Sequence, residues 1–169
     1  MKKRRLIGGL LFVLAMVGVV LLLFWIKQHY NPDVYGRSRP EWTRIFEETD
    51  NPEERQEAAE ALIEALRVTR GPNRVYAVKP LALWVSENPD KQLNLPPEAA
   101  LVLGDALKDK NGAVRYYSLA VLQHMGPKAK EAVPAILEML NDPHSDDRGY
   151  AAKVLWKIDP EAAAKAGQP

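Results

Sequence analysis

Apolar and polar positions divide the chain into one continuous apolar run and a long region of helical periodicity. Residues 6–26 contain no charge, no proline and no strongly polar side chain. After residue 40, apolar side chains recur every three or four residues, which predicts amphipathic helices, and no long stretch alternates with the two-residue period of a half-buried strand. We expect helices over residues 6–29, 40–48, 52–68, 74–87, 97–108, 112–125, 129–140 and 145–158, and a short frayed helix from 160.

The apolar run has the length of a membrane span. About 20 residues of helix cross the roughly 30 Å hydrocarbon core of a bilayer. The run ends in bulky residues such as Phe24 and Trp25 rather than in a small-x-small cleavage site, and Trp25 and Tyr30 suit the headgroup level. We therefore predict a permanent transmembrane helix through 6–26, in preference to a cleaved signal or a buried core helix.

The flanking charges predict an orientation. Four basic residues occupy positions 2–5, so the positive-inside bias places the N-terminus in the cytoplasm and residues 30–169 on the other side. The predicted organisation is a basic flank and anchor over 1–30, a linker over 31–40 and a helical domain over 41–169. The linker contains two prolines and a glycine and shows no apolar period, as expected of a spacer or a collar.

The second half of the chain contains an internal repeat. A shift of thirty-three residues superposes 109–129 on 142–162 without a gap. It also places 98–109 under 131–142, so one unit is a helix, a proline-containing turn and a second helix. The matched residues are Asp109 with Asp142, Arg115 with Arg148, Leu122 with Leu155, Met125 with Ile158, Pro127 with Pro160, and Ala129 with Ala162.

A more distant copy of the first helix is found at 50–66. There Arg55 stands seven residues before Leu62, as Arg115 stands seven before Leu122. Residues 40–48, which precede this copy, occupy the place of a second helix. Asp50 or Asn51 and, later, Asn111 can cap helix starts, and Gly126 favours a helix stop.

Each helix pair has an apolar face that only a neighbouring pair can cover, so stacking is the expected source of the core. The predicted fold class is all-α: a short α-solenoid of stacked helix pairs, preceded by one transmembrane helix.

The repeat pattern resembles HEAT-like repeats, in particular the short kind named after phycobilisome lyases. The resemblance rests on an Asp, an Arg six residues later, a Leu, a Gly-Pro or Asp-Pro turn and the stretch AVPAILEMLND at 132–142. It covers 97–162 well and 41–68 loosely. It implies a right-handed α-solenoid whose second helices line a concave face, in a family whose members mostly bind other proteins or assemble complexes.

Composition excludes some classes of function. The chain has 23 Lys plus Arg and 22 Asp plus Glu. Without the four basic residues of the N-terminal flank the balance is −3, which argues against a nucleic-acid binder. The absence of cysteine excludes disulfides, thiolate catalysis and Cys-ligated metals.

Catalytic motifs are missing from the sequence. No nucleophile elbow holds a Ser-His-Asp set, no glycine-rich phosphate loop is present, and the His-Glu pairs of HEAT-like di-iron hydroxylases do not occur. We therefore expect no enzymatic activity and no cofactor.

Two polar patterns have both a chemical and a structural interpretation. The segment NDPHSDD at 141–147 places Asp142, His144, Asp146 and Asp147 together as a possible metal site, but such residues also gather before helices to cap them, and we favour capping. The repeated Asp109–Arg115 and Asp142–Arg148 combinations could be acid and base partners. Their repetition favours a structural ladder, in which each Arg holds turn carbonyls or the Asp of a neighbouring unit.

Six residues are candidates for contact with a partner. Arg67, Arg70 and Arg74 form a basic stretch that is either a solvated helix end or a contact for lipid headgroups or an acidic partner. Trp84, Tyr116 and Trp156 are either interface hot spots or packed between helices. The final helix lacks large apolar residues, so it either frays or is completed by another protein.

The function predicted from these observations is a membrane-anchored scaffold that binds a protein partner through its helical surface. The alternatives are a lyase-like or chromophore-handling accessory protein, and a structural membrane protein that self-associates. Nucleic acid is not an expected partner.

Overall fold

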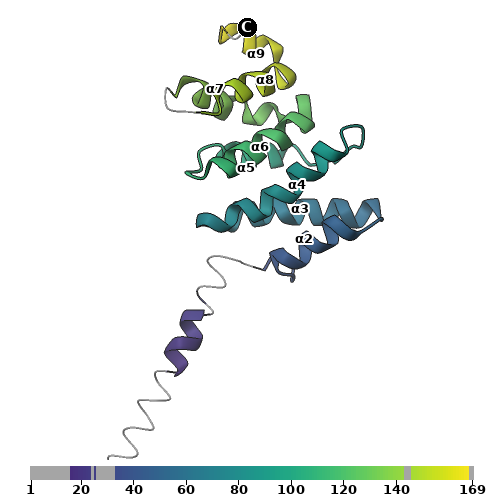
Figure 1. Cartoon of the computed structure of the whole chain (residues 1–169), viewed down its shortest axis with the longest axis vertical. Coiled ribbons are helices and arrows are strands. Elements are labelled where there is room, and N and C mark those ends of the chain that lie inside the picture. The colour runs from purple at the N-terminus through teal and green to yellow at the C-terminus, as the bar shows by residue number, and fades with distance from the viewer. Residues whose placement is uncertain (1–15, 24, 26–32, 143–145, 168–169) are drawn as a thin grey trace, which may run out of the picture.

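The computed structural model describes residues 16–23, 25, 33–142 and 146–167 (Figure 1). This part of the chain is all-helical, as the apolar periodicity predicts, and its one extended pairing is a bridge between Val34 and Arg37. Two 3-10 segments, η1 (Gly71–Arg74) and η2 (Gly126–Ala132), lead into α4 and α7. From residue 33 onward, the α-helices are α2 (Arg39–Glu48), α3 (Pro52–Val68), α4 (Val75–Glu87), α5 (Glu98–Ala106), α6 (Gly112–Met125), α7 (Val133–Asn141), α8 (Arg148–Ile158) and α9 (Pro160–Lys165).

The predicted transmembrane helix over 6–26 is contradicted. Residues 16–23 and 25 are helical, and the rest of that range lies outside the described residues. Among the described residues no helix is long and apolar enough to cross a membrane, since a span needs about 20 apolar residues in one helix. This finding overturns the single-pass assignment, together with the cytoplasmic N-terminus and the extracytoplasmic domain that the basic flank predicts.

Helix boundaries follow the local signals in the sequence. The helices predicted over 52–68 and 112–125 have those bounds as α3 and α6. Asn51 accepts a hydrogen bond from the N–H of Glu53 at 2.9 Å, and Asn111 accepts one from Ala113 at 3.0 Å, so both cap their helices as expected. The helix predicted over 129–140 instead begins as the 3-10 segment η2 and becomes α-helical at Val133.

The helices stack in layers along the long axis of the molecule (Figure 1). Helix α2 packs against α4, α4 against α6, and α6 against α8; we call these four helices the first row. Helix α3 packs against α5, which packs against η2 and α7; we call this the second row. Within the first and last layers, α2 packs on α3 and α8 on α9.

The rows correct the predicted register of the first unit. The sequence pattern predicts a second helix at residues 40–48 and a first helix at 50–66. In the structure α2 belongs to the first row and α3 to the second, because their packing partners are α4 and α5. Both helices carry apolar stripes, so their local patterns do not distinguish the two rows.

One continuous core runs through the stack from Val34 to Ala163. Four alanines of α3 are buried, which lets its neighbours approach closely. The largest fully buried side chains are Trp42, Phe46, Leu62, Leu66, Leu81, Leu103, Leu119, Leu122, Ile136, Leu155 and Ile158.

The predicted linker over 31–40 packs onto this core at Val34 and forms a collar there. Val34 is buried, and its backbone exchanges hydrogen bonds of 2.8 and 3.1 Å with Arg37. The indole Nε1 of buried Trp42 donates to the Val34 carbonyl at 2.7 Å. Helix α2 begins two residues after Arg37, at Arg39.

Candidate functional site

The basic stretch of Arg67, Arg70 and Arg74 does not act as one patch. Arg67 is exposed and forms an ion pair with Glu64 one turn earlier in α3. Arg70 donates from Nη1 to the Arg67 carbonyl at 3.4 Å. Arg74 is only 8% exposed. The three side chains therefore have separate environments, and Arg74 offers little surface to a partner.

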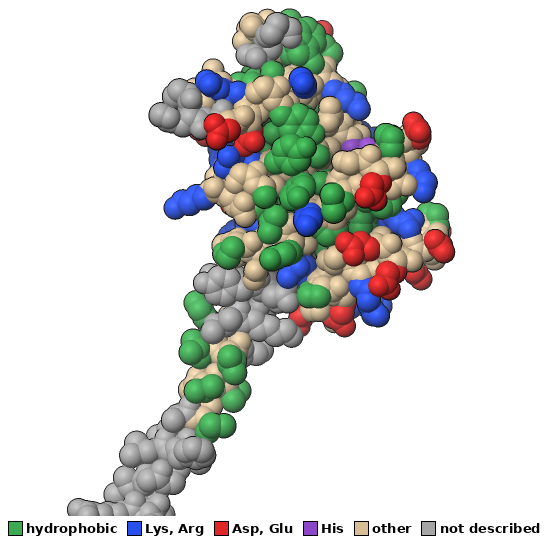
Figure 2. All heavy atoms as spheres, in the orientation of Figure 1, with side chains coloured by type: hydrophobic (Ala, Val, Ile, Leu, Met, Phe, Trp, Pro, Cys, Tyr) green, Lys and Arg blue, Asp and Glu red, His purple; other side chains and the backbone are tan. Residues whose placement is uncertain are grey.

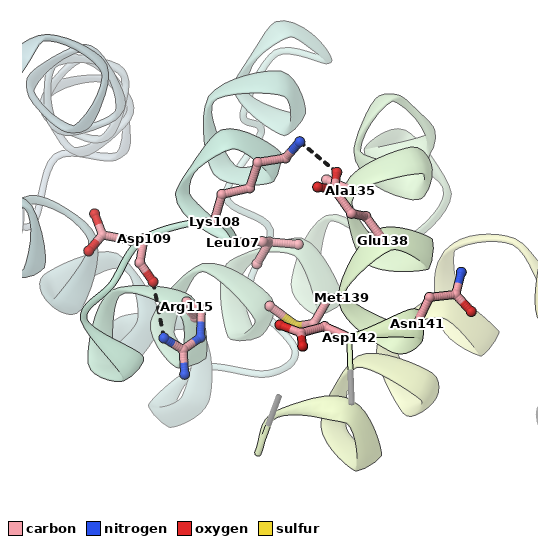
Figure 3. A pocket seen from close by; sticks show the side chains of 9 residues that line it. All are labelled: Leu107, Lys108, Asp109, Arg115, Ala135, Glu138, Met139, Asn141 and Asp142. Carbon is pink, nitrogen blue, oxygen red and sulfur yellow. Dashed lines mark hydrogen bonds and ion pairs between the residues drawn. The ribbon is translucent and has the colours of Figure 1, made fainter. Parts of the chain in front are cut away.

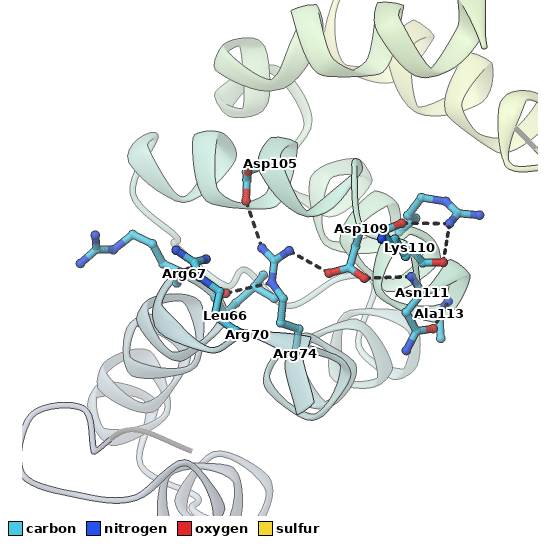
Figure 4. Close-up of polar contacts among 10 residues, drawn as sticks. Leu66, Arg67, Arg70, Arg74, Asp105, Asp109, Lys110, Asn111 and Ala113 are labelled. Carbon is cyan, nitrogen blue, oxygen red and sulfur yellow. Dashed lines mark hydrogen bonds and ion pairs between the residues drawn. The ribbon is translucent and has the colours of Figure 1, made fainter. Parts of the chain in front are cut away.

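Arg74 joins three segments of the stack (Figure 4). Its Nε donates to the carbonyl of Leu66 near the end of α3, at 3.3 Å. Its Nη1 lies 2.8 Å from Oδ2 of Asp109, and its Nη2 lies 3.1 Å from Oδ2 of Asp105. The solvated helix end that the sequence suggested is, at Arg74, a buried structural contact.

Arg115 makes the corresponding contacts one layer later. Its Nη1 donates to the Asp109 carbonyl at 3.0 Å, and its Nε lies 2.7 Å from Oδ2 of Asp147. The predicted structural role of the Asp and Arg repetition fits this geometry, since Arg115 holds a turn carbonyl and an acid of the next unit. The Asp147 side chain is paired with Arg115 and makes no capping hydrogen bond to α8.

These arginines belong to a recurring pattern along the first row, which we call the arginine ladder. Each stands seven residues before a buried apolar side chain. At the start of the row the guanidinium of Arg39 lies 5.2 Å from the ring centroid of Tyr76 on α4. The pairs of arginine and buried residue are Arg39 and Phe46, Arg74 and Leu81, Arg115 and Leu122, and Arg148 and Leu155.

Trp84 lies between helices. Its ring meets Phe46 edge to face with centroids 6.1 Å apart, and the guanidinium of Arg55 lies 5.8 Å from its centroid. Arg55 also donates hydrogen bonds to the carbonyls of Thr49 and Phe46. Trp84 therefore contributes mainly to the packing of α2, α3 and α4.

Tyr116 and Trp156 are exposed on the first row, at 53% and 38% of their surfaces. The ring centroid of Tyr116 lies 5.7 Å from that of Tyr117 and 5.3 Å from that of Tyr150 on α8. The Tyr150 hydroxyl donates to Oε1 of Gln123 at 3.0 Å, and burial raises the pKa of Tyr150. Tyr116 is thus an exposed ring whose position is fixed by two neighbouring rings.

A tyrosine recurs two residues after the ladder arginine on three successive helices of the first row. These are Tyr76 on α4, Tyr117 on α6 and Tyr150 on α8. With Tyr116 we call them the aromatic row. The sequence signal for this row is the motif Arg-x-Tyr, which occurs at 74–76, 115–117 and 148–150. Hydrophobic side chains run through the middle of the face shown in Figure 2.

A hollow of about 640 Å³ is lined by residues on and next to α5, α6 and α7 (Figure 3). Lys108 and Glu138 form an ion pair of 2.5 Å across it. Asp109 and Arg115 are engaged in the ladder. These four charged groups are therefore already engaged in contacts within the stack. The lining residues are Leu107, Lys108, Asp109, Arg115, Ala135, Glu138, Met139, Asn141 and Asp142.

The possible metal site at 141–147 depends on His144, which lies outside the described residues. Elsewhere, the residues that the structure describes contain no group of three potential His, Asp or Glu ligands.

The surface charge is strongly uneven, which the overall balance conceals. Residues 41–64 contain nine acidic and two basic residues. All of these acids except Glu64 are exposed. In Figure 2 acidic side chains are concentrated at the end of the stack where α2 and α3 lie. Counting charge by helix rather than by chain would have found this feature from the sequence.

No protein-family model matches this sequence, and a search of the curated proteins found no match.

Proposed function

We propose that the protein is a protein-interaction module, built as a short HEAT-like α-solenoid, and that the aromatic row on its first-row face binds a protein partner. The observation that carries this proposal is the exposure of large aromatic side chains on neighbouring helices of the first row. Tyr76 is 54% exposed and Tyr116 is 53% exposed, on α4 and α6. Tyrosine and tryptophan dominate the centres of protein interfaces because they combine a large apolar surface with a polar edge.

The rings are held before any partner arrives. Tyr116 rests against Tyr117 and Tyr150, and the guanidinium of Arg39 lies over Tyr76. Binding loses affinity when flexible side chains must be immobilised, so rings that are already positioned favour association. The underlying helices are tied to one another by the arginine ladder, which supports a rigid binding face.

Photo-crosslinking tests the proposal in cells that naturally express the protein. Benzoylphenylalanine replaces Tyr116 in the full chain, and a matched control carries it in place of Glu131, which is exposed on η2. We expect one predominant adduct with another protein from the first variant and none from the control. The absence of an adduct at position 116, or the same adducts from both positions, would contradict the proposal. An adduct of two copies of the chain would show self-association instead.

Affinity measurements with the identified partner give the second test. Tyr76→Ala combined with Tyr116→Ala is expected to weaken binding by about tenfold or more, the size expected for loss of interface hot spots. Leu101→Ala is the control, because Leu101 is 53% exposed but lies on α5 of the second row. Equal losses from both variants would argue against the aromatic row.

A further inference from the structure

A groove of about 260 Å³ lies between α3 and α5 on the second row, away from the aromatic row. Its apolar surface comes from Ile63 and from Ala99 and Val102 of α5, with Pro96 at one side. Three carboxylates stand around these apolar groups. We call it the acidic groove, and its lining residues are Tyr35, Glu60, Ile63, Glu64, Arg67, Pro96, Glu98, Ala99 and Val102.

Tyr35 is presented to the acidic groove by a constrained turn. It is the only described non-glycine residue with positive φ, at 50°, and Gly36 follows it with a φ of 77°. The Val34–Arg37 hydrogen bonds close this turn, and the buried indole of Trp42 holds the Val34 carbonyl. A tyrosine in the left-handed region is uncommon, and such residues cluster at functional sites where surrounding contacts enforce them. The collar therefore places a 69% exposed ring at the groove against its own backbone preference.

The charges around the acidic groove favour a cationic ligand. Arg67 neutralises Glu64, with which it forms an ion pair. Glu60 accepts a hydrogen bond from Gln56 at 2.7 Å, and no ion pair to Glu60 or Glu98 is found among the described residues. The exposed acids of α2 and α3 surround this side of the stack and add to the negative potential.

We propose that the acidic groove binds a segment of a partner protein that carries an aliphatic side chain flanked by lysine or arginine. Burial of the aliphatic side chain against the apolar side chains of the groove stabilises the complex. The carboxylates attract the flanking cations and increase the association rate. An acidic segment binds weakly because the carboxylates of the groove repel it. A basic segment without an aliphatic side chain also binds weakly, because it leaves the apolar side chains of the groove exposed to water. This site is separate from the aromatic row, so the two proposals can fail independently.

Three short peptides with blocked ends test this specificity on the full chain by amide NMR titration. The first is Lys-Arg-Leu-Leu-Lys-Arg, the second replaces its charges to give Glu-Asp-Leu-Leu-Glu-Asp, and the third is Lys-Arg-Ser-Ser-Lys-Arg. We expect saturable shifts at the amides of Tyr35, Ile63 and Val102 with the first peptide only. Equal binding of the second or third peptide, or shifts elsewhere in the chain, would overturn the proposal.

Matched charge variants separate the groove from general attraction. The double variant Glu60→Gln and Glu98→Gln is expected to lower the affinity for the first peptide by about tenfold, because two close charge contacts are lost. Glu47→Gln with Glu53→Gln removes the same net charge from exposed positions outside the groove and is expected to change binding by less than about twofold. Equal weakening by both pairs would show non-specific attraction and refute the site. Tyr116→Ala leaves this binding unchanged if the two surfaces are separate.

Discussion

The guanidinium of Arg74 lies 2.8 Å from the carboxylate of Asp109, thirty-five residues later in the chain. The side chains of both residues are nearly buried, at 9% and 13% exposure. This ion pair links the start of α4 to the segment that precedes α6. It turns one of three adjacent arginines into a structural element of the stack.

Asp109→Asn is expected to lower the free energy of unfolding by about 2 kcal/mol, because it leaves the nearly buried Arg74 charge without its closest acid. The asparagine oxygen can still accept the hydrogen bond from the Asn111 N–H, so the change isolates the charge. Urea unfolding measures the difference.

The control for that variant is Asp105→Asn. Asp105 also pairs with Arg74, but its side chain is 69% exposed, so we expect a loss below about 0.5 kcal/mol. Equal effects of the two variants would mean that Arg74 does not depend on a buried partner.

Two glycines are expected to respond in opposite directions to alanine. Gly126 ends α6 with a φ of 56° and a ψ of −134°, so Gly126→Ala is expected to cost about 1–3 kcal/mol from backbone strain alone. Apart from the chain neighbours and the backbone of the same helix, no atom lies within 4 Å of a Cβ added at Gly126 or at Gly149. Gly149→Ala in α8 is expected to stabilise by about 0.5 kcal/mol, since alanine loses less entropy in a helix. Thermal unfolding of both variants checks the sign of each change.

Tyr35→Asn is expected to stabilise the protein while weakening the acidic groove. Asparagine tolerates the left-handed conformation better than tyrosine, so relief of the strain at a φ of 50° should contribute about 0.5–1 kcal/mol. Loss of the ring removes one side of the groove. Unfolding and titration with the basic aliphatic peptide are measured on the same sample. A variant that is less stable, or that binds as tightly as the original, would contradict the assigned strain.

His124 makes stability depend on pH. Burial, followed by the nearby charge of Lys157, lowers the pKa of His124, while a backbone contact at Lys91 opposes the shift. The folded state then binds fewer protons than the unfolded state, so stability is fully present above pH 6.5 and declines as the pH falls below that value. Lys157→Gln is expected to raise the pKa of His124 in an NMR titration, and an unchanged pKa would exclude the proposed charge effect.

The helices could be predicted because their signals are local. Asn51 and Asn111 cap the helices that follow them, and Gly126 stops α6, so boundaries follow from neighbouring residues. The row to which α2 and α3 belong depends on contacts with α4 and α5, which the local periodicity does not contain.

The candidate surfaces were less predictable because they depend on distant residues. The two acids that pair with Arg74 lie thirty-one and thirty-five residues later in the chain. The basic charge of residues 67–74 alone does not predict these contacts. The spacing from Arg74 to Leu81 was a usable signal, since it repeats at Arg115 and Leu122. The acidic groove combines the collar, α3 and α5, so no single stretch of sequence contains it.

The arginine ladder determines how the stack comes apart. In a linear array each layer is stabilised by its neighbours, and the strength of the coupling between layers decides whether they melt together or one at a time. Arg74 and Arg115 each bridge consecutive layers through an acid, whereas α9 is a six-residue helix at the end of the stack whose main packing partner is α8. Amide hydrogens of α4 and α6 should therefore exchange only in a shared, global opening. Those of α9 should exchange first, through fraying that leaves the aromatic row and the acidic groove intact.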